Sequence, residues 1–145
     1  MNLTQRPPRS PRVRLGGYVI LPRMLDKCRA EIAGTAGDFH YACGLDQHFL
    51  RFVGVDSAAL KEEVAKGLGD SDLLNWIQAN ASFKREPWEI AQWSAFQEAA
   101  APMSNEGRSG FNDMLNGLNA GHRTDILTSF DRLDLDDFVS YGGKA

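Results

Sequence analysis

Short runs of apolar residues at helical spacing, separated by glycine or proline, restrict the fold of this chain most strongly. Within residues 21–32 the apolar side chains stand at i, i+3, i+4, i+7 and i+11: Leu21, Met24, Leu25, Cys28 and Ile32. This spacing places them on one face of an α-helix. Pro22 suits a first turn and Gly34 suits a C-terminal cap, so we expect a helix over residues 21–32.

Later segments repeat the pattern with other start and stop signals. The expected helix starts are Asp46 as an N-cap, Ser57, Asp70 or Ser71, Pro87, and Ser104 or Asn105, and the expected stops include Gly54, Lys66–Gly67 and Gly121. The helix from Pro87 carries Trp88, Trp93 and Phe96 and is apolar on more than one face, so it is the expected central helix. Residues 125–141 are expected to form turns and a last short helix.

The fold class follows from these segments. We predict a mainly all-α protein with five to seven short helices in one compact domain over residues 1–145. Residues 38–43 lack helical spacing and contain aromatic side chains, so any sheet is limited to a short strand or hairpin there. With 145 residues and 43% hydrophobic composition, the chain is long enough to bury one core without disulfides.

The segment RSPRVRLGG, residues 9–17, is basic in an otherwise acidic chain. Residues 1–14 contain four arginines and no acid, so the rest of the chain carries a net charge of −7. Three prolines among the first eleven residues oppose a helix, so residues 1–16 are expected to form an extended arm that packs on the helical domain. Gly16 and Gly17 would let this arm fold back sharply.

Two roles for the arm remain open. In the first, a structural clamp, the arm arginines pair with acids such as Asp26 and Asp46. In the second, an anion pocket, they form a shared cationic site with Arg23 and Lys27. Nucleic acid is not the expected partner, because four positive charges are few for a polyanion.

Composition also bears on location and cofactors. No apolar run approaches the roughly 20 residues needed to span a bilayer, and arginines and prolines stand where a signal peptide would be apolar. We therefore expect a cytoplasmic protein without membrane contact, in which Cys28 and Cys43 stay reduced. The sequence contains no nucleotide-binding or hydrolase motif, and we predict no cofactor.

The runs PRSPRVRLGGYVILPRMLDKCRA and HYACGLDQHFLRFVGVD resemble an uncharacterised bacterial family catalogued as a domain of unknown function. The resemblance is strong over residues 10–56 and looser over the rest. Its motifs are PRSPRxxLGG, LPRxxDKxRA and CxLD. The resemblance implies that these motifs form one structural unit, and it assigns no activity, cofactor or substrate.

Two patterns have residue types used in catalysis or metal binding. His40, Cys43 and His48 form H-x2-C-x4-H, but structural zinc sites are usually closed by four ligands, and the fourth candidate, Cys28, stands on an apolar helical face. We therefore expect no metal. Cys43 is alternatively a nucleophile near a helix N-terminus, with one of the histidines as its base. The acids of the tail are expected to be caps and solvated carboxylates: Asp131, Asp134, Asp136 and Asp137.

The polar face of the first predicted helix is the candidate site, because the glycine turn precedes it and the aperiodic segment follows it. Charged residues on one side of a helix usually form a solvated face. Here the basic arm is expected to fold back toward this face, so we treat the face as a candidate site. The candidate ligand-binding residues are Arg12, Arg14, Arg23, Asp26, Lys27, Tyr41 and Asp46. We favour a non-enzymatic helical binding or interaction protein that takes a protein or a small anionic ligand here. The alternative is a small enzyme that uses Cys43 or an Asp46 and His48 pair.

Overall fold

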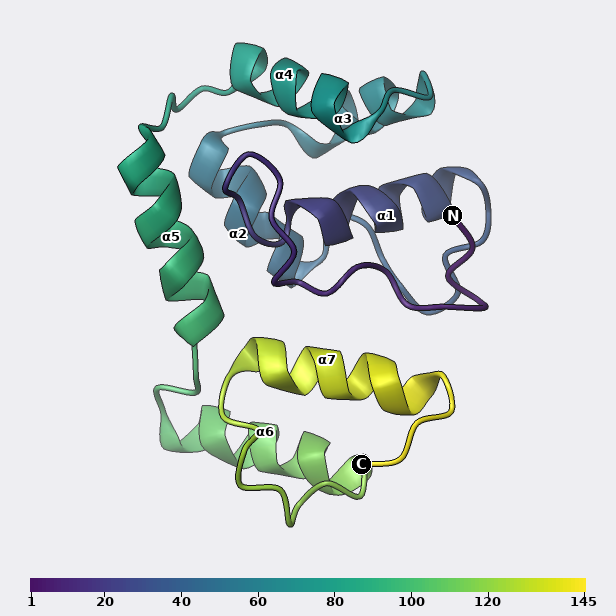
Figure 1. The fold of residues 1–145 in the computed structure, drawn as a ribbon, viewed down its shortest axis with the longest axis vertical. Coiled ribbons are helices and arrows are strands. Elements are labelled where there is room, and N and C mark those ends of the chain that lie inside the picture. The colour runs from purple at the N-terminus through teal and green to yellow at the C-terminus, as the bar shows by residue number, and fades with distance from the viewer.

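The computed structural model describes all 145 residues and contains helices joined by turns and loops (Figure 1). Its seven helices are α1 (Leu21–Ile32), α2 (Gly44–Val53), α3 (Ser57–Ala65), α4 (Asp70–Asn80), α5 (Pro87–Ala99), α6 (Asn105–Gly117) and α7 (Ser129–Ser140). The predicted all-α class is therefore confirmed. Residues 38–43 form turns and irregular backbone without a strand. None of the helices combines the length and the apolar character that crossing a membrane requires.

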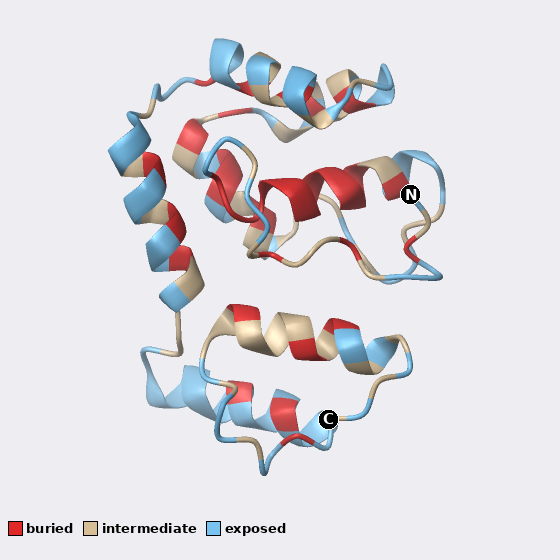
Figure 2. Ribbon diagram, viewed as in Figure 1, coloured by how far each residue is buried: buried red, intermediate tan, exposed pale blue.

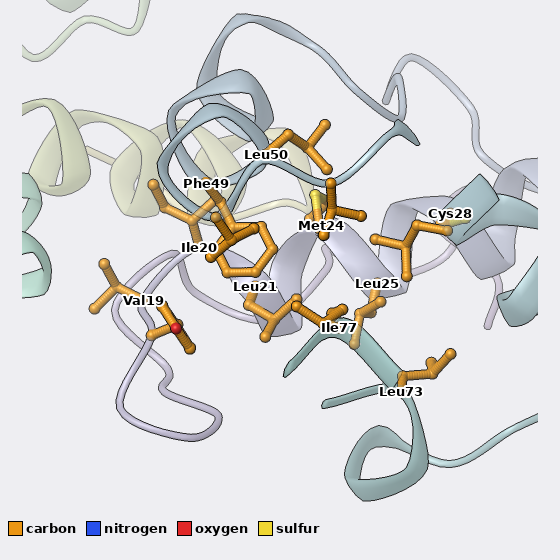
Figure 3. Packing of buried hydrophobic residues seen from close by; sticks show 14 of the residues in the cluster. Val19, Ile20, Leu21, Met24, Leu25, Cys28, Phe49, Leu50, Leu73 and Ile77 are labelled. Atoms are coloured by element: carbon orange, nitrogen blue, oxygen red, sulfur yellow. The ribbon is translucent and has the colours of Figure 1, made fainter. Parts of the chain in front are cut away.

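Helix α1 is the most buried element and lies at the centre of the group formed by α1 to α4 (Figure 1, Figure 2). Leu21, Met24, Leu25 and Cys28 belong to a cluster of eighteen buried residues, whereas Ile32 at the end of the same predicted face is 43% exposed. Figure 3 shows Met24, Leu25 and Cys28 of this cluster, together with Phe49 of α2 and Ile77 of α4. Burying one such side chain stabilises the fold by roughly 1.5–3 kcal/mol, so this cluster fixes the position of α1.

Several helix ends follow the sequence signals, but three do not: the starts of α2 and α4, and the end of α6, which stops at Gly117 before the expected Gly121. Helix α1 spans the predicted residues, and Gly54 ends α2 with a left-handed φ of 69°. The prediction that Asp46 caps α2 is wrong, because the helix begins at Gly44 and Asp46 lies inside its first turn. Asp70 is likewise the first residue of α4 and not its cap. Both carboxylates form ion pairs with basic side chains of other segments.

The prediction that the helix from Pro87 is central is also wrong. Helix α5 lies at one side of the molecule and connects the α1–α4 group to α6 and α7 (Figure 1). Trp88 and Phe96 are 62% and 61% exposed, whereas Trp93 packs inward and stacks on Phe52 with ring centroids 4.8 Å apart. An apolar composition on several faces permits burial but does not decide which helix is buried on all sides.

Helices α6 and α7 pair below this group in Figure 1 around a second, smaller cluster. Phe111 and Leu115 of α6 meet Leu135 of α7 there. Helix α7 also contributes Phe130, which is 1% exposed, to the larger cluster. Helix α7 thus belongs to both clusters and holds the second one against the first.

A tight turn joins the N-terminal arm, residues 1–16, to the entry of α1. Leu15 and Tyr18 exchange two backbone hydrogen bonds of 3.0 Å in a single antiparallel bridge. Gly16 and Gly17 between them have φ values of 58° and 85°, the positive values that a two-residue hairpin turn of this type requires. The turn reverses the chain, so that the arm runs between α1 and α7 (Figure 1).

Candidate functional site

Three of the four arginines of the N-terminal arm, Arg9, Arg12 and Arg14, lie on carboxylates of four helices. Arg9 Nε and Nη2 donate to Asp26 Oδ2 and Oδ1 of α1 at 2.9 and 2.8 Å, and Nη1 reaches Asp70 of α4 at 2.6 Å. Arg14 Nη2 lies 3.0 Å from Glu98 of α5. These contacts are the ones that a structural clamp needs, and they pair Arg9 and Arg14 with carboxylates of the protein itself.

Arg12 is held in the same way on α7. Its guanidinium contacts Asp131 and lies 3.3 Å from Asp134. Asp131 also accepts from the backbone of Leu127 and Thr128 as part of the capping box of α7. Arg12 and Arg14 therefore lie away from the other predicted site residues of α1.

Asp70 links the arm to α1 through two guanidinium groups. Arg29 Nη1 of α1 lies 2.7 Å from Asp70 Oδ1, opposite the contact from Arg9. Burial raises the pKa of Asp70, but the hydrogen bonds from Arg9 and Arg29 outweigh it and lower the pKa below its ordinary value. Asp70 therefore stays ionised in acid that would protonate a free carboxyl.

A cavity of about 680 Å³ opens beside the arm. It is lined by Leu3 and Thr4 of the arm, by α1, by residues of the segment 37–45, and by the last turns of α7. Tyr141, which follows α7, donates its hydroxyl to the carbonyl of Leu3 and ties the two ends of the chain together at this cavity. The volume suits a small organic molecule.

Two buried cations of α1 form part of the cavity wall. The side chains of Arg23 and Lys27 are each 4% exposed. Arg23 binds Asp137 of α7 through two hydrogen bonds, of 2.6 and 3.0 Å, and also donates to the carbonyl of Arg9. The guanidinium lies 5.6 Å from the ring centre of Phe39, another lining residue. Arg23 thus joins α1, α7 and the arm at one point.

Lys27 lies between a carboxylate and a thiol. Its Nζ is 2.8 Å from Asp46 Oδ1 and 3.1 Å from Cys43 Sγ. Asp46 is fully buried, and the Lys27 ammonium is its ion-pair partner. Burial raises the pKa of Asp46, and the nearby Lys27 ammonium opposes that rise only in part. Cys43 is the N-cap of α2, is partly exposed, and lines the cavity.

The remaining predicted residues take other positions. Tyr41 donates its hydroxyl to the Ser57 carbonyl at 2.9 Å and does not line the cavity. His48 points to α5, where its Nδ1 is 2.9 Å from Gln97 Oε1. Asp46 and His48 therefore do not meet, because each contacts a different neighbour of α2.

The H-x2-C-x4-H pattern is divided in space. His40 and Cys43 line the cavity, whereas His48 contacts α5. The structure contains no group of three or more His, Cys, Asp or Glu side chains placed to hold a metal ion.

Sequence reasoning brought Arg23 and Lys27 into the site but missed the contribution of α7. Asp137 is buried in an ion pair, and the prediction of a solvated carboxylate is wrong for this residue. Asp136, Ser140 and Tyr141 also line the cavity. The pair of Arg23 and Asp137 is separated by 114 residues, and no local spacing signals it.

Fold and site together define an all-α protein whose basic arm runs beside a cavity with two buried cations. The sequence model of a family described as Domain of unknown function (DUF5069) matches residues 5–139, so the chain belongs to this family. This confirms the resemblance to a domain of unknown function. No protein with a curated description matches the chain.

Proposed function

We propose that this protein binds a small anionic molecule in the cavity between the arm, α1 and α7. The observation that carries the proposal is the pair of buried cations, Arg23 and Lys27, in the wall of a cavity of about 680 Å³. Guanidinium and ammonium groups in water-poor surroundings are strong ligands for carboxylate and phosphate oxygens.

Both cations keep donors for a ligand. Lys27 has three N–H donors and the guanidinium of Arg23 has five. The protein engages Lys27 with Asp46 and Cys43, and it uses Arg23 in three hydrogen bonds. The ion pairs with Asp46 and Asp137 hold the two side chains in place, so a ligand would meet donors that are already oriented.

The other lining residues indicate which groups the ligand carries besides its anionic group. Asp38 and Asp136 line the cavity without an ion-pair partner, and Leu3, Phe39 and Leu133 supply apolar surface. A ligand that combines a carboxylate with a hydrogen-bond donor group would match both kinds of charge. Glutamate has this combination, and glutarate is the same skeleton without the ammonium group.

The test is a titration of the full chain with inorganic phosphate, glutarate and glutamate, followed by backbone amide shifts in nuclear magnetic resonance. At least one of these anions should shift the amides of Lys27, Cys43 and Tyr141 in a saturable way. A variant that fills the cavity, Ser140→Trp, should abolish those shifts, and Ser109→Trp on the exposed surface of α6 is the matched control. If no anion shifts the cavity amides, or if Ser140→Trp does not change the response, the proposal is wrong.

A further inference from the structure

We infer that two copies of this chain associate through the outward face of α5. This side of the helix is turned away from the rest of the molecule and is exposed along its length (Figure 2). No residue of α5 lines the anion-binding cavity, so the interaction is separate from the proposed function.

The outward face of α5 carries no charge. After the first residue of the helix, Pro87, the exposed residues are Trp88, Ala91, Gln92, Ala95, Phe96 and Ala99. The solvated side of a surface helix is normally charged or polar, whereas an apolar side normally packs against another surface. The composition of this face therefore indicates that it is covered by another surface.

Charge favours a second copy as that surface. The two charged residues of α5, Glu89 and Glu98, stand at opposite edges of the face, and each is paired within the chain. Glu89 lies 3.5 Å from Arg85, and Glu98 lies 3.0 Å from Arg14. A neutral face does not attract a charged partner, but two such faces can meet without contact between like charges although each chain has a net charge of −3.

The face also has aromatic side chains beside a hollow. Trp88 and Phe96 are 62% and 61% exposed. Together with the stacked rings of Trp93 and Phe52, they border a shallow hollow of about 370 Å³. Protein interfaces draw most of their binding free energy from a few aromatic side chains that fill such hollows on the partner.

The order of residues along α5 fits a second copy that runs antiparallel. In a two-fold symmetric dimer the same patch of each copy pairs with itself. An antiparallel pairing about the middle of α5 places Trp88 of one copy opposite Ala99 of the other, and Gln92 opposite Ala95. It also brings Phe96 of each copy level with the hollow of the other. Large side chains thus meet small ones, which lets two helices pack closely.

The size of the face predicts a weak dimer. An aromatic side chain has about 150–250 Å² of surface, so the exposed parts of Trp88 and Phe96 supply roughly 200–300 Å² per copy. A standard interface buries about 800 Å² per partner. The smaller residues of the face add to the aromatic area, but the contact stays at the low end of specific interfaces. We therefore expect a dissociation constant in the micromolar range.

Sedimentation velocity of the full chain, from about 1 to about 500 µM at pH 7, tests the dimer. The average mass should rise from that of one chain toward that of two. Phe96→Ala should weaken association at least tenfold. Phe138→Ala on α7 is the matched control, because Phe138 is 58% exposed but lies outside the face, and it should have no effect. A chain that stays monomeric over the whole range, or equal effects of the two substitutions, would overturn the inference.

Charges placed at Gln92 test the antiparallel arrangement, because the two Gln92 side chains lie near each other across the two-fold axis. Gln92→Glu and Gln92→Lys should each weaken association at least tenfold, since like charges then meet. An equimolar mixture of the two variants should associate at least tenfold more tightly than either alone. Gln5→Glu, an exposed change in the arm, is the control and should have no effect. If the mixture associates no more tightly than the separate variants, α5 does not pair with itself and the inference is wrong.

Discussion

Arg9 shows how one residue can hold three segments together. Its guanidinium contacts Asp26 of α1 and Asp70 of α4, and it also donates to the carbonyl of Pro22. Asp26 is almost fully buried, with a side chain that is 2% exposed. Removing Arg9 would leave that carboxylate in the interior without its main partner, which is the costly way to break an ion pair.

We therefore expect Arg9→Ala to lower the free energy of unfolding by about 2–3 kcal/mol; the third of the Arg9 side chain that is exposed reduces the loss from that of a fully buried pair. Arg14→Ala is the matched control, because neither Arg14 nor Glu98 is buried, with side chains 40% and 30% exposed, and a pair of this kind contributes at most about 1 kcal/mol. Urea denaturation at pH 7 measures both variants. Equal effects of the two substitutions would show that Arg9 is not the main contact of the arm.

At the scale of single helices, the sequence predicted α1 better than its surroundings. The apolar spacing and Pro22 were sufficient for its position, because both signals are local. The burial of its charged face could not be predicted in the same way. Arg23, Asp26 and Lys27 have the pattern of a solvated surface and are nevertheless buried. Their partners stand elsewhere in the chain, and periodicity contains no information about such pairs.

The same distinction between local and distant information explains the two wrong assignments of helix position. Trp88 and Phe96 made α5 resemble a central helix, but centrality depends on which helices pack around it. Asp46 and Asp70 resemble N-caps in sequence, but α2 begins at Gly44 and α4 at Asp70 itself, and both carboxylates pair with basic side chains of other segments. The cavity was not predictable as a whole, because α7 forms one of its walls from the far end of the chain.

The end of α2 offers a test of one helix terminus. Gly54 has a φ of +69°, and a Cβ there would lie 2.8 Å from Ser82 Cβ, which is fixed to its own backbone. Gly34 after α1 has a similar φ of +67° but open space around it. We expect Gly34→Ala to cost about 1 kcal/mol from the backbone conformation alone, and Gly54→Ala to cost about 2–3 kcal/mol because the contact adds to it.

Thermal denaturation followed by circular dichroism, with urea denaturation for the free energies, compares these two variants. Their helical content at 20 °C should be the same as that of the unchanged protein. A cost for Gly54→Ala no greater than that for Gly34→Ala would mean that the Ser82 segment moves away without loss.

Over the whole molecule, ion pairs connect the arm to α1, α4, α5 and α7, so stability depends on the ionisation of their carboxylates. Burial raises the pKa of Asp70 and of Asp131, but for each the hydrogen bonds it accepts outweigh burial and leave the pKa below the ordinary value of 3.8. A carboxyl with a lowered pKa in the folded state stabilises the fold above its unfolded pKa, and this contribution is lost as the pH falls through the folded value. Asp46 has a raised pKa, so its protonation acts in the opposite direction.

We therefore expect the melting temperature to fall as the pH is lowered from about 5 to 3, and to fall less steeply in Asp70→Asn, which has no carboxylate left to protonate. The variant should already be less stable than the unchanged protein at pH 7, so the two curves should converge in acid. Scanning calorimetry at pH 7, 5, 4 and 3 measures both curves. Parallel curves over this range would contradict a role for the ionised Asp70.

The arm is an early segment whose partners are made late. Arg9 and Asp70 are 61 residues apart, and Arg12 and Asp131 are 119 apart. At a synthesis rate of about 5–20 residues per second, Arg12 is synthesised roughly 6–24 s before its acid on α7. During that interval Arg9 can already close on Asp26 and later on Asp70, whereas Arg12 has no partner and Arg23 still lacks Asp137. The order of synthesis thus divides the arm into two parts. Arg9 can form its ion pairs early, whereas Arg12 can do so only after α7 has been synthesised.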